Sequence, residues 1–209
     1  KKIITELKME NYSMGSEHLK IFSAISLKRE ILNILEIGTF DGYFSVFLSK
    51  LFPKSEIDTL DLKDNSEKFK EIYSRENFEN NKKYFQTRKQ NLSKSKNISF
   101  QQRGSVSLIN ENFKKYDLIW IDGYHGAPTV IIDIVNAIRI SKDNALILID
   151  DVYLYGDPYS PYQSDATIKT LKELENNKII KYNLFYKRIG KKVNKNEYSQ
   201  KFIALIEKC

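Results

Sequence analysis

The sequence predicts an α/β fold in which helices cover a mostly parallel sheet. Short apolar segments of strand length recur, helical patterns separate them, and glycine or acidic residues follow their ends. The segment 116–152 shows all three features: residues 117–121 and 145–149 are apolar strands, and residues 127–140 carry apolar side chains at helical spacing, with Pro128 in a first turn. Because two strands joined by a helical crossover are nearly always parallel and adjacent, their carboxyl ends should meet at one edge.

Acidic residues follow both of these strands. Asp122 comes directly after the first strand, and Asp150 and Asp151 come directly after the second. Three carboxylates at one edge repel one another unless a proton or a cation neutralises them. The sequence therefore favours a divalent metal at this edge.

The first half of the chain shows a related pattern. Residues 31–37 are an apolar strand that runs into a turn with Gly38 and Gly42, where backbone can approach a ligand, and a helical pattern follows. The G-x-x-x-G spacing differs from the dinucleotide fingerprint, which disfavours a nicotinamide-dependent dehydrogenase. Asp61 ends the next strand, residues 56–60, where it could accept hydrogen bonds from ribose hydroxyls.

The remaining segments complete the expected order of elements. Residues 1–30 should form an N-terminal helical segment, with His18 on the surface. Residues 63–96 should form two helical pieces, part of them an insertion. This insertion could cover the site or form a surface for a partner. The other expected elements are a short strand at 98–101, a helix at 167–174, and an antiparallel edge pair at 178–189 and 201–207.

Composition indicates one soluble globular domain over residues 1–209. The chain is 41% hydrophobic and 29% charged, and its mean hydropathy is −0.47. No apolar run approaches the roughly 20 residues that cross a bilayer, so no membrane association is expected. The start lacks the apolar core of a secretory signal and lacks an initiator Met, which suggests a trimmed start. The single cysteine, Cys209, allows no internal disulfide, and a cytoplasmic location is expected.

The net charge of +7 raises the question of a nucleic-acid partner. Basic residues gather in 82–103 and 178–195, but neither stretch contains a known nucleic-acid-binding motif. We therefore expect solvated basic faces and consider nucleic acid an unlikely partner. A basic nucleic-acid-binding protein with a vestigial cofactor site stays as an alternative.

Five motifs, in order, resemble the class I S-adenosylmethionine-dependent methyltransferases. They are LEIGTFDGYF, TLDL, QRGSV, IDGYH and ILIDDV, and they are similar to the metal-dependent O-methyltransferase branch of catechol, caffeoyl-CoA and macrolide-sugar enzymes. The resemblance runs from residue 35 to the C-terminus and is weakest over 63–96. It implies a Rossmann-like three-layer sandwich with a seven-stranded, mostly parallel sheet, an antiparallel last strand and helices on both faces.

The resemblance also implies roles for individual residues. Asp122, Asp150 and Asp151 match the metal ligands, with Mg²⁺ expected and Mn²⁺ or Ca²⁺ as alternatives, and His125 matches the general base. The implied contacts of S-adenosylmethionine are its methionine part at Glu36, Gly38, Phe40 and Gly42, its ribose at Asp61, and its adenine at Gly104, Ser105 and Tyr124, with Asp122 also beside the cofactor.

Two positions depart from the family pattern. Phe44 replaces a serine that often contacts the cofactor, and Asp151 replaces a frequent asparagine, which leaves open whether Asp151 touches the metal. The implied reaction is methyl transfer to a small-molecule hydroxyl, of a sugar or a catechol-like compound, against which tyrosines of residues 152–165 could stack. A metal-dependent hydroxylase of similar fold is the rival enzyme, and a homodimer is left open.

Overall fold

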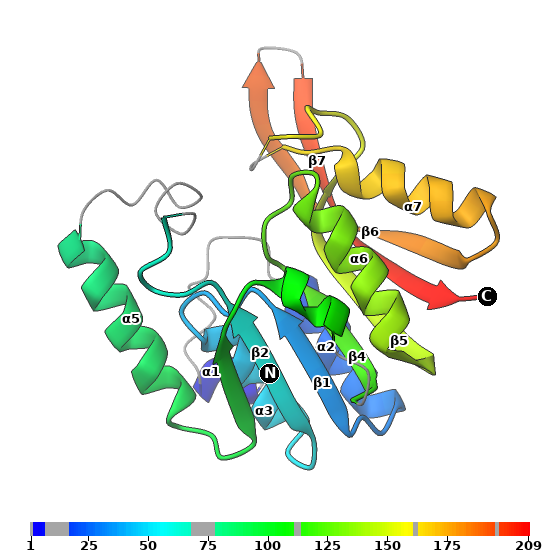
Figure 1. Cartoon of the computed structure of the whole chain (residues 1–209). Helices are drawn as coiled ribbons and strands as arrows, with labels where there is room; N and C mark the ends of the chain where they lie inside the picture. The colour runs from blue at the N-terminus through cyan, green and yellow to red at the C-terminus, as the bar shows by residue number, and fades with distance from the viewer. Residues whose placement is uncertain (1, 7–16, 68–77, 111–113, 161–162, 195–196) are drawn as a thin grey trace.

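A twisted seven-stranded sheet forms the centre of the computed structural model, which describes residues 2–6, 17–67, 78–110, 114–160, 163–194 and 197–209 (Figure 1). The strand order is β3-β2-β1-β4-β5-β7-β6. β7 pairs antiparallel with both β5 and β6, whereas the other pairs are parallel. The predicted mostly parallel sheet with a reversed last strand is confirmed. The strands are β1 (Asn33–Ile37), β2 (Glu56–Asp61), β3 (Ile98–Gln102), β4 (Tyr116–Ile121), β5 (Ser141–Tyr153), β6 (Ile180–Asn194) and β7 (Glu197–Lys208).

Helices cover both faces of the sheet (Figure 1). α6 (Thr129–Ile140), α7 (Ala166–Asn176) and the 3₁₀ helix η2 (Ser105–Asn110) pack on one face. α2 (Glu17–Lys28) and α3 (Tyr43–Leu51) pack on the other, where α1 (Lys2–Glu6) and α5 (Phe78–Leu92) lie beside α3. This arrangement gives the three layers expected of the fold.

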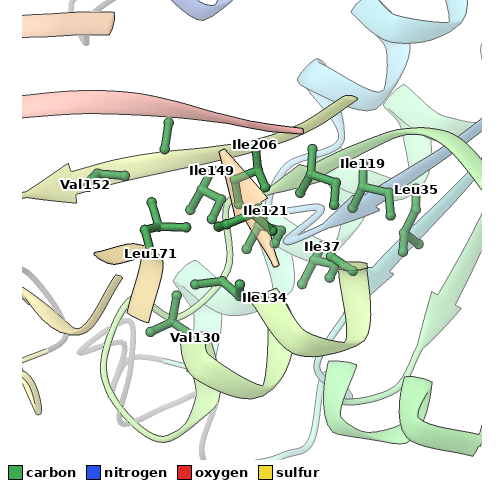
Figure 2. Close-up of a cluster of buried hydrophobic side chains, with 14 of the residues drawn as sticks. Leu35, Ile37, Ile119, Ile121, Val130, Ile134, Ile149, Val152, Leu171 and Ile206 are labelled. Carbon is green, nitrogen blue, oxygen red and sulfur yellow. The ribbon is translucent and has the colours of Figure 1, made fainter. Parts of the chain in front are cut away.

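Alternation along the strands creates a hydrophobic core on each face. In β1, Leu35 and Ile37 face α6, whereas Ile34 faces α2 and α3. Figure 2 shows Leu35, Ile37 and their neighbours gathered against α6. Strands buried on both faces explain why the predicted strands are apolar along their whole length.

Residues 116–152 form the predicted strand, helix and strand, but the buried face of the helix differs from its most apolar residues. Val130 and Ile134 of α6 are fully buried, but Ile131 is 37% and Val135 is 50% exposed. The apolar residues at helical spacing in 127–140 include Ile131 and Val135, so hydropathy alone does not separate these two from the buried positions. The buried face turns instead toward Asp133, a polar position that hydropathy alone does not place in a core.

Three further expectations meet the structure. His18 is half-buried, with its ring stacked on Trp120 at 6.1 Å between centroids, so its predicted surface position was wrong. In residues 63–96, α5 is the crossover that links β2 to β3, while most of the first predicted helical piece (residues 68–77) lies outside the described residues. Within the described part of the chain, none of the helices combines the length and the apolar character that a membrane crossing needs.

Candidate active site

The predicted acidic residues lie at one edge of the sheet. Ile121 of β4 pairs with Ile149 of β5 in parallel register. Asp122 and Asp150, the next residue after each, therefore lie side by side. The Asp122 amide also donates to the Ile37 carbonyl, at 2.8 Å, which ties the end of β4 to the end of β1. The topology argument from the sequence therefore places these carboxylates correctly.

A β-bulge in β5 places Asp150 and Asp151 opposite a single residue of β7. Ile149 pairs with Ala204 and Val152 with Phe202, so Asp150 and Asp151 together oppose the single residue Ile203. Asp151 has a φ of 49°, a left-handed conformation that costs a non-glycine residue roughly 1 kcal/mol. In a regular strand two successive side chains would point to opposite faces. The bulge instead lets both carboxylates bind one cation.

That cation is the ammonium group of Lys187. Its Nζ donates to Asp150 Oδ2, and to Asp151 Oδ1 at 2.9 Å. Lys201 Nζ donates to the other oxygen of Asp151 at 2.6 Å. Burial works against the charge on Lys187, but Asp150 and Asp151 outweigh it and raise its pKa.

His125 lies in the turn after β4, facing the same acids. Its Nε2 is 3.7 Å from Asp122 Oδ1, and its side chain is 12% exposed. Burial lowers the pKa of His125, although Asp151 and Asp150 oppose the shift. Burial and the charge of Asp150 raise the pKa of Asp122. A neutral imidazole near neutral pH can accept a proton.

The carboxylates do not fit a metal ion as they are arranged. Asp150 Oδ2 and both oxygens of Asp151 are bound by lysine ammonium groups. Among the residues that the structure describes, no group of three His, Cys, Asp or Glu side chains is arranged to hold a metal. The roles of Asp122, Asp150 and Asp151 as metal ligands stay a prediction.

The glycine turn after β1 lies at the same edge. Gly38 has a φ of 100°, and a Cβ there would lie 2.2 Å from the Asp122 carbonyl oxygen, so only glycine fits between the ends of β1 and β4. Gly42 (φ 75°) begins α3 without a side-chain cap. The N-terminus of α3, the positive end of its dipole, therefore lies at this edge, where an anionic group would be stabilised.

Asp61 ends β2 beside that turn. Its Oδ2 accepts the Phe40 amide at 3.0 Å, and its Oδ1 accepts the Leu62 amide at 2.8 Å. Burial raises the pKa of Asp61 despite these contacts and despite the charge of Arg88, whose guanidinium is 3.7 Å away. Arg88 also pairs with Asp64. The position suits a ribose diol, and the surrounding contacts hold the carboxylate in place.

Glu36 and Phe44 face the core in this structure. Glu36 is 1% exposed and accepts hydrogen bonds from the hydroxyls of Ser45 and Thr59, while burial raises its pKa to about 8. Phe44 packs its ring against Trp120, at 5.5 Å between centroids. The serine-to-phenylalanine departure thus extends an aromatic cluster under α2.

The predicted adenine residues follow two different strands, β3 and β4, which lie on opposite sides of β1. Gly104 and Ser105 lead into η2 after β3. The Tyr124 ring lies over Gly126, where a Cβ would come within 2.6 Å of it, and its hydroxyl donates to the Tyr159 carbonyl at 3.2 Å. Contact of these residues with adenine stays a prediction.

A sequence profile described as a methyltransferase domain matches residues 35–152. The match covers more than half of the chain and includes every predicted site residue. The chain belongs to this methyltransferase family. No protein of curated function matches the sequence.

By fold, this methyltransferase is similar to solved structures of other methyltransferases, some of which hold S-adenosylmethionine or S-adenosylhomocysteine. The O-methyltransferase TomG of Streptomyces achromogenes, in complex with S-adenosylmethionine, is 17% identical over 99% of this chain and 86% of its own, with a TM-score of 0.61. An O-methyltransferase from Bacillus cereus with S-adenosylhomocysteine is 17% identical over 100% and 91%, with a TM-score of 0.63. An rRNA methylase from Streptococcus thermophilus is 12% identical over 92% and 94%, with a TM-score of 0.60. The fold therefore leaves the acceptor undecided.

Sequence reasoning missed the cations of this methyltransferase. Lys187 and Arg88 fall in the two basic stretches that were expected to be solvated, and this expectation was wrong for both, because their side chains are 12% and 3% exposed. Lys201 completes the set from β7. The signal in the sequence was the need for positive charge beside three acids, which lysine side chains can supply as well as a metal ion.

Proposed function

We propose that this methyltransferase transfers a methyl group from S-adenosylmethionine to a hydroxyl of a small molecule, with His125 as the general base. The observation that carries the proposal is the position of His125. Its imidazole lies beside Asp122 at the end of β4, at the same sheet edge as the glycine turn and Asp61. A base beside a methyl-donor site is what an oxygen nucleophile needs.

S-adenosylmethionine supplies an electrophilic methyl group: the acceptor oxygen bonds to it while the carbon–sulfur bond breaks and its electron pair stays on sulfur. His125 accepts the hydroxyl proton, so charge does not accumulate on the acceptor. Asp61 and the N-terminus of α3 hold the donor, and alignment of the two reactants supplies much of the acceleration.

Two exposed tyrosines in the segment after β5 favour a small acceptor that has an apolar or aromatic face. Tyr155 is 81% and Tyr159 is 70% exposed. The Pro158 carbonyl accepts the Ala127 amide at 2.8 Å, which holds this loop against the turn that carries His125. Tyrosine rings beside the base could stack on a catechol-like ring or on the apolar face of a sugar.

Two measurements test this function. Calorimetry with S-adenosylhomocysteine should show stoichiometric binding, and labelled methyl from S-adenosylmethionine should appear on members of a panel of hydroxylated sugars and catechols. Binding without methyl transfer, together with oxygen insertion into an acceptor, would favour the hydroxylase instead.

The His125→Ala variant should lower turnover by about 100-fold or more, because it removes the proton acceptor. Its affinity for S-adenosylhomocysteine should stay within about threefold of wild type, because His125 does not support the donor residues. Asp143→Asn, an exposed position at the far end of β5, is the control that should keep full turnover. Wild-type turnover in His125→Ala would remove the residue from this role.

A further inference from the structure

We propose that Lys187 and Lys201 serve as built-in cations of the active site, taking the place of a divalent metal. This inference rests on the proposed function and concerns how its acidic edge is neutralised. The two ammonium groups hold three of the four carboxylate oxygens of Asp150 and Asp151. They carry the same +2 charge that a magnesium ion would bring.

The ion pairs of Lys187 and Lys201 are largely shielded from solvent, so they are part of the interior of the site and not of its surface. The side chains of Lys187 and Asp150 are 12% and 4% exposed, and those of Lys201 and Asp151 are 24% and 21% exposed. A metal ion entering here would have to displace the ammonium groups or lie beside them. Displacement would leave buried cations without partners, and coexistence would place like charges within a few ångströms.

The backbone is shaped around this pairing on both sides. Asp150 and Asp151 occupy one bulge, opposite Ile203. Lys187 occupies a second: Tyr186 pairs with Phe202 and Arg188 with Lys201, so Lys187 has no cross-strand partner. Bulges re-aim side chains, and here two of them direct acids and a lysine to one point across β7.

Lys201 has an additional contact that fixes its position. It lies directly opposite Tyr153 in the β5–β7 pairing, and its ammonium is 5.4 Å from the centre of that ring. A cation held by both a carboxylate and an aromatic face is well placed to stay protonated and ordered. Asp122 and His125 then face two acids whose negative charge is already balanced by two lysines. Lys187 and Lys201 are positioning residues, since they act through Asp150 and Asp151.

The test measures binding of Mn²⁺ alone, by electron paramagnetic resonance and calorimetry, so that it requires no acceptor. The wild-type chain should show no saturable binding up to about 1 mM Mn²⁺. The double variant Lys187→Met, Lys201→Met frees the carboxylates and should bind Mn²⁺ saturably with a Kd of about 0.1 mM or lower, at least about tenfold below the wild-type limit. The double arginine variant keeps both charges and should behave as wild type. Lys181→Met, an exposed lysine of β6, is the matched control.

Stoichiometric Mn²⁺ binding to the wild-type chain at micromolar concentration overturns the proposal, whether or not the variants fold. With an acceptor from the panel, turnover in EDTA should equal turnover in Mg²⁺ within about twofold; loss in EDTA with recovery in Mg²⁺ also overturns it. Failure of S-adenosylhomocysteine to bind would instead count against the proposed function, and the Mn²⁺ result would still decide the role of the lysines.

Discussion

The two halves of the sheet neutralise their strand-end acids in different ways. On the β1–β2 side, Asp61 binds two backbone amides, and Arg88 approaches from the crossover helix α5. On the β4–β5 side, Asp150 and Asp151 bind lysines from β6 and β7. The first half holds its acid with nearby backbone, whereas the second depends on the antiparallel strands.

This difference matches the chemistry proposed for each half. A ribose diol needs a fixed acceptor that can exchange partners, which amide-held Asp61 provides. An oxygen nucleophile needs a base held in place, and His125 would serve as that base beside acids that Lys187 and Lys201 neutralise. Breaking the two kinds of contact separately should therefore have different consequences.

The largest effect is expected from Lys187→Met. Removing the shared cation leaves Asp150 and Asp151 partly buried and close together, which should lower the free energy of unfolding by about 3–5 kcal/mol. Urea denaturation followed by circular dichroism measures this change. Lys181→Met on the exposed face of the same strand should change stability by less than about 0.5 kcal/mol. Equal effects of both substitutions would mean that the ion pairs are surface-like.

The next effect concerns Asp133, a buried carboxyl of α6. It is 1% exposed, and burial raises its pKa to about 6 from an ordinary 3.8. The fold favours the protonated form, so stability should fall as pH rises from the unfolded-state value through 6, by roughly 2 kcal/mol. Asp133→Asn should remove this part of the pH dependence.

Urea titrations of the wild type and Asp133→Asn at about pH 5 and pH 7.5 measure the difference. Because Glu36, with a pKa raised to about 8, shifts stability in the same direction, only the difference between the two proteins reports on Asp133. Parallel pH profiles would show that Asp133 ionises in the fold as freely as in the unfolded chain.

The smallest effect is expected from Arg88→Met on the donor side. Arg88 lies 3.7 Å from Asp61 and packs over Phe100 at 4.5 Å, so its loss should loosen Asp61 without removing its amide contacts. Affinity for S-adenosylhomocysteine should fall about tenfold by calorimetry. Lys89→Met, the exposed neighbour on α5, is the control. A loss as large as that from Asp61→Ala would make Arg88 a direct cofactor contact.

The sequence predicts much of the framework because periodicity and crossover rules act locally. Residues 117–121, 127–140 and 145–149 form the predicted strand, helix and strand, and parallel pairing then brings Asp122 and Asp150 together. These inferences need only hydropathy and the handedness of connections.

The partners of the acids could not be predicted in the same way. Lys187 and Lys201 lie 36 and 50 positions beyond Asp151. Their approach depends on bulges in β5 and β6, which shift the alternation that sequence patterns assume. A single bulge exchanges the face of every later residue, so hydropathy alone predicts a solvated position for Lys187 and gives no partner for Lys201.

The position of β7 between β5 and β6 has a consequence for how the enzyme forms. Strands β1 to β5 precede it in the chain, yet β7 carries Lys201 and holds β6, with Lys187, in the sheet. Until β7 docks, Asp150 and Asp151 repel each other at an open sheet edge. Docking of β7 therefore completes both the strand order of the sheet and the ion pairs of Asp150 and Asp151.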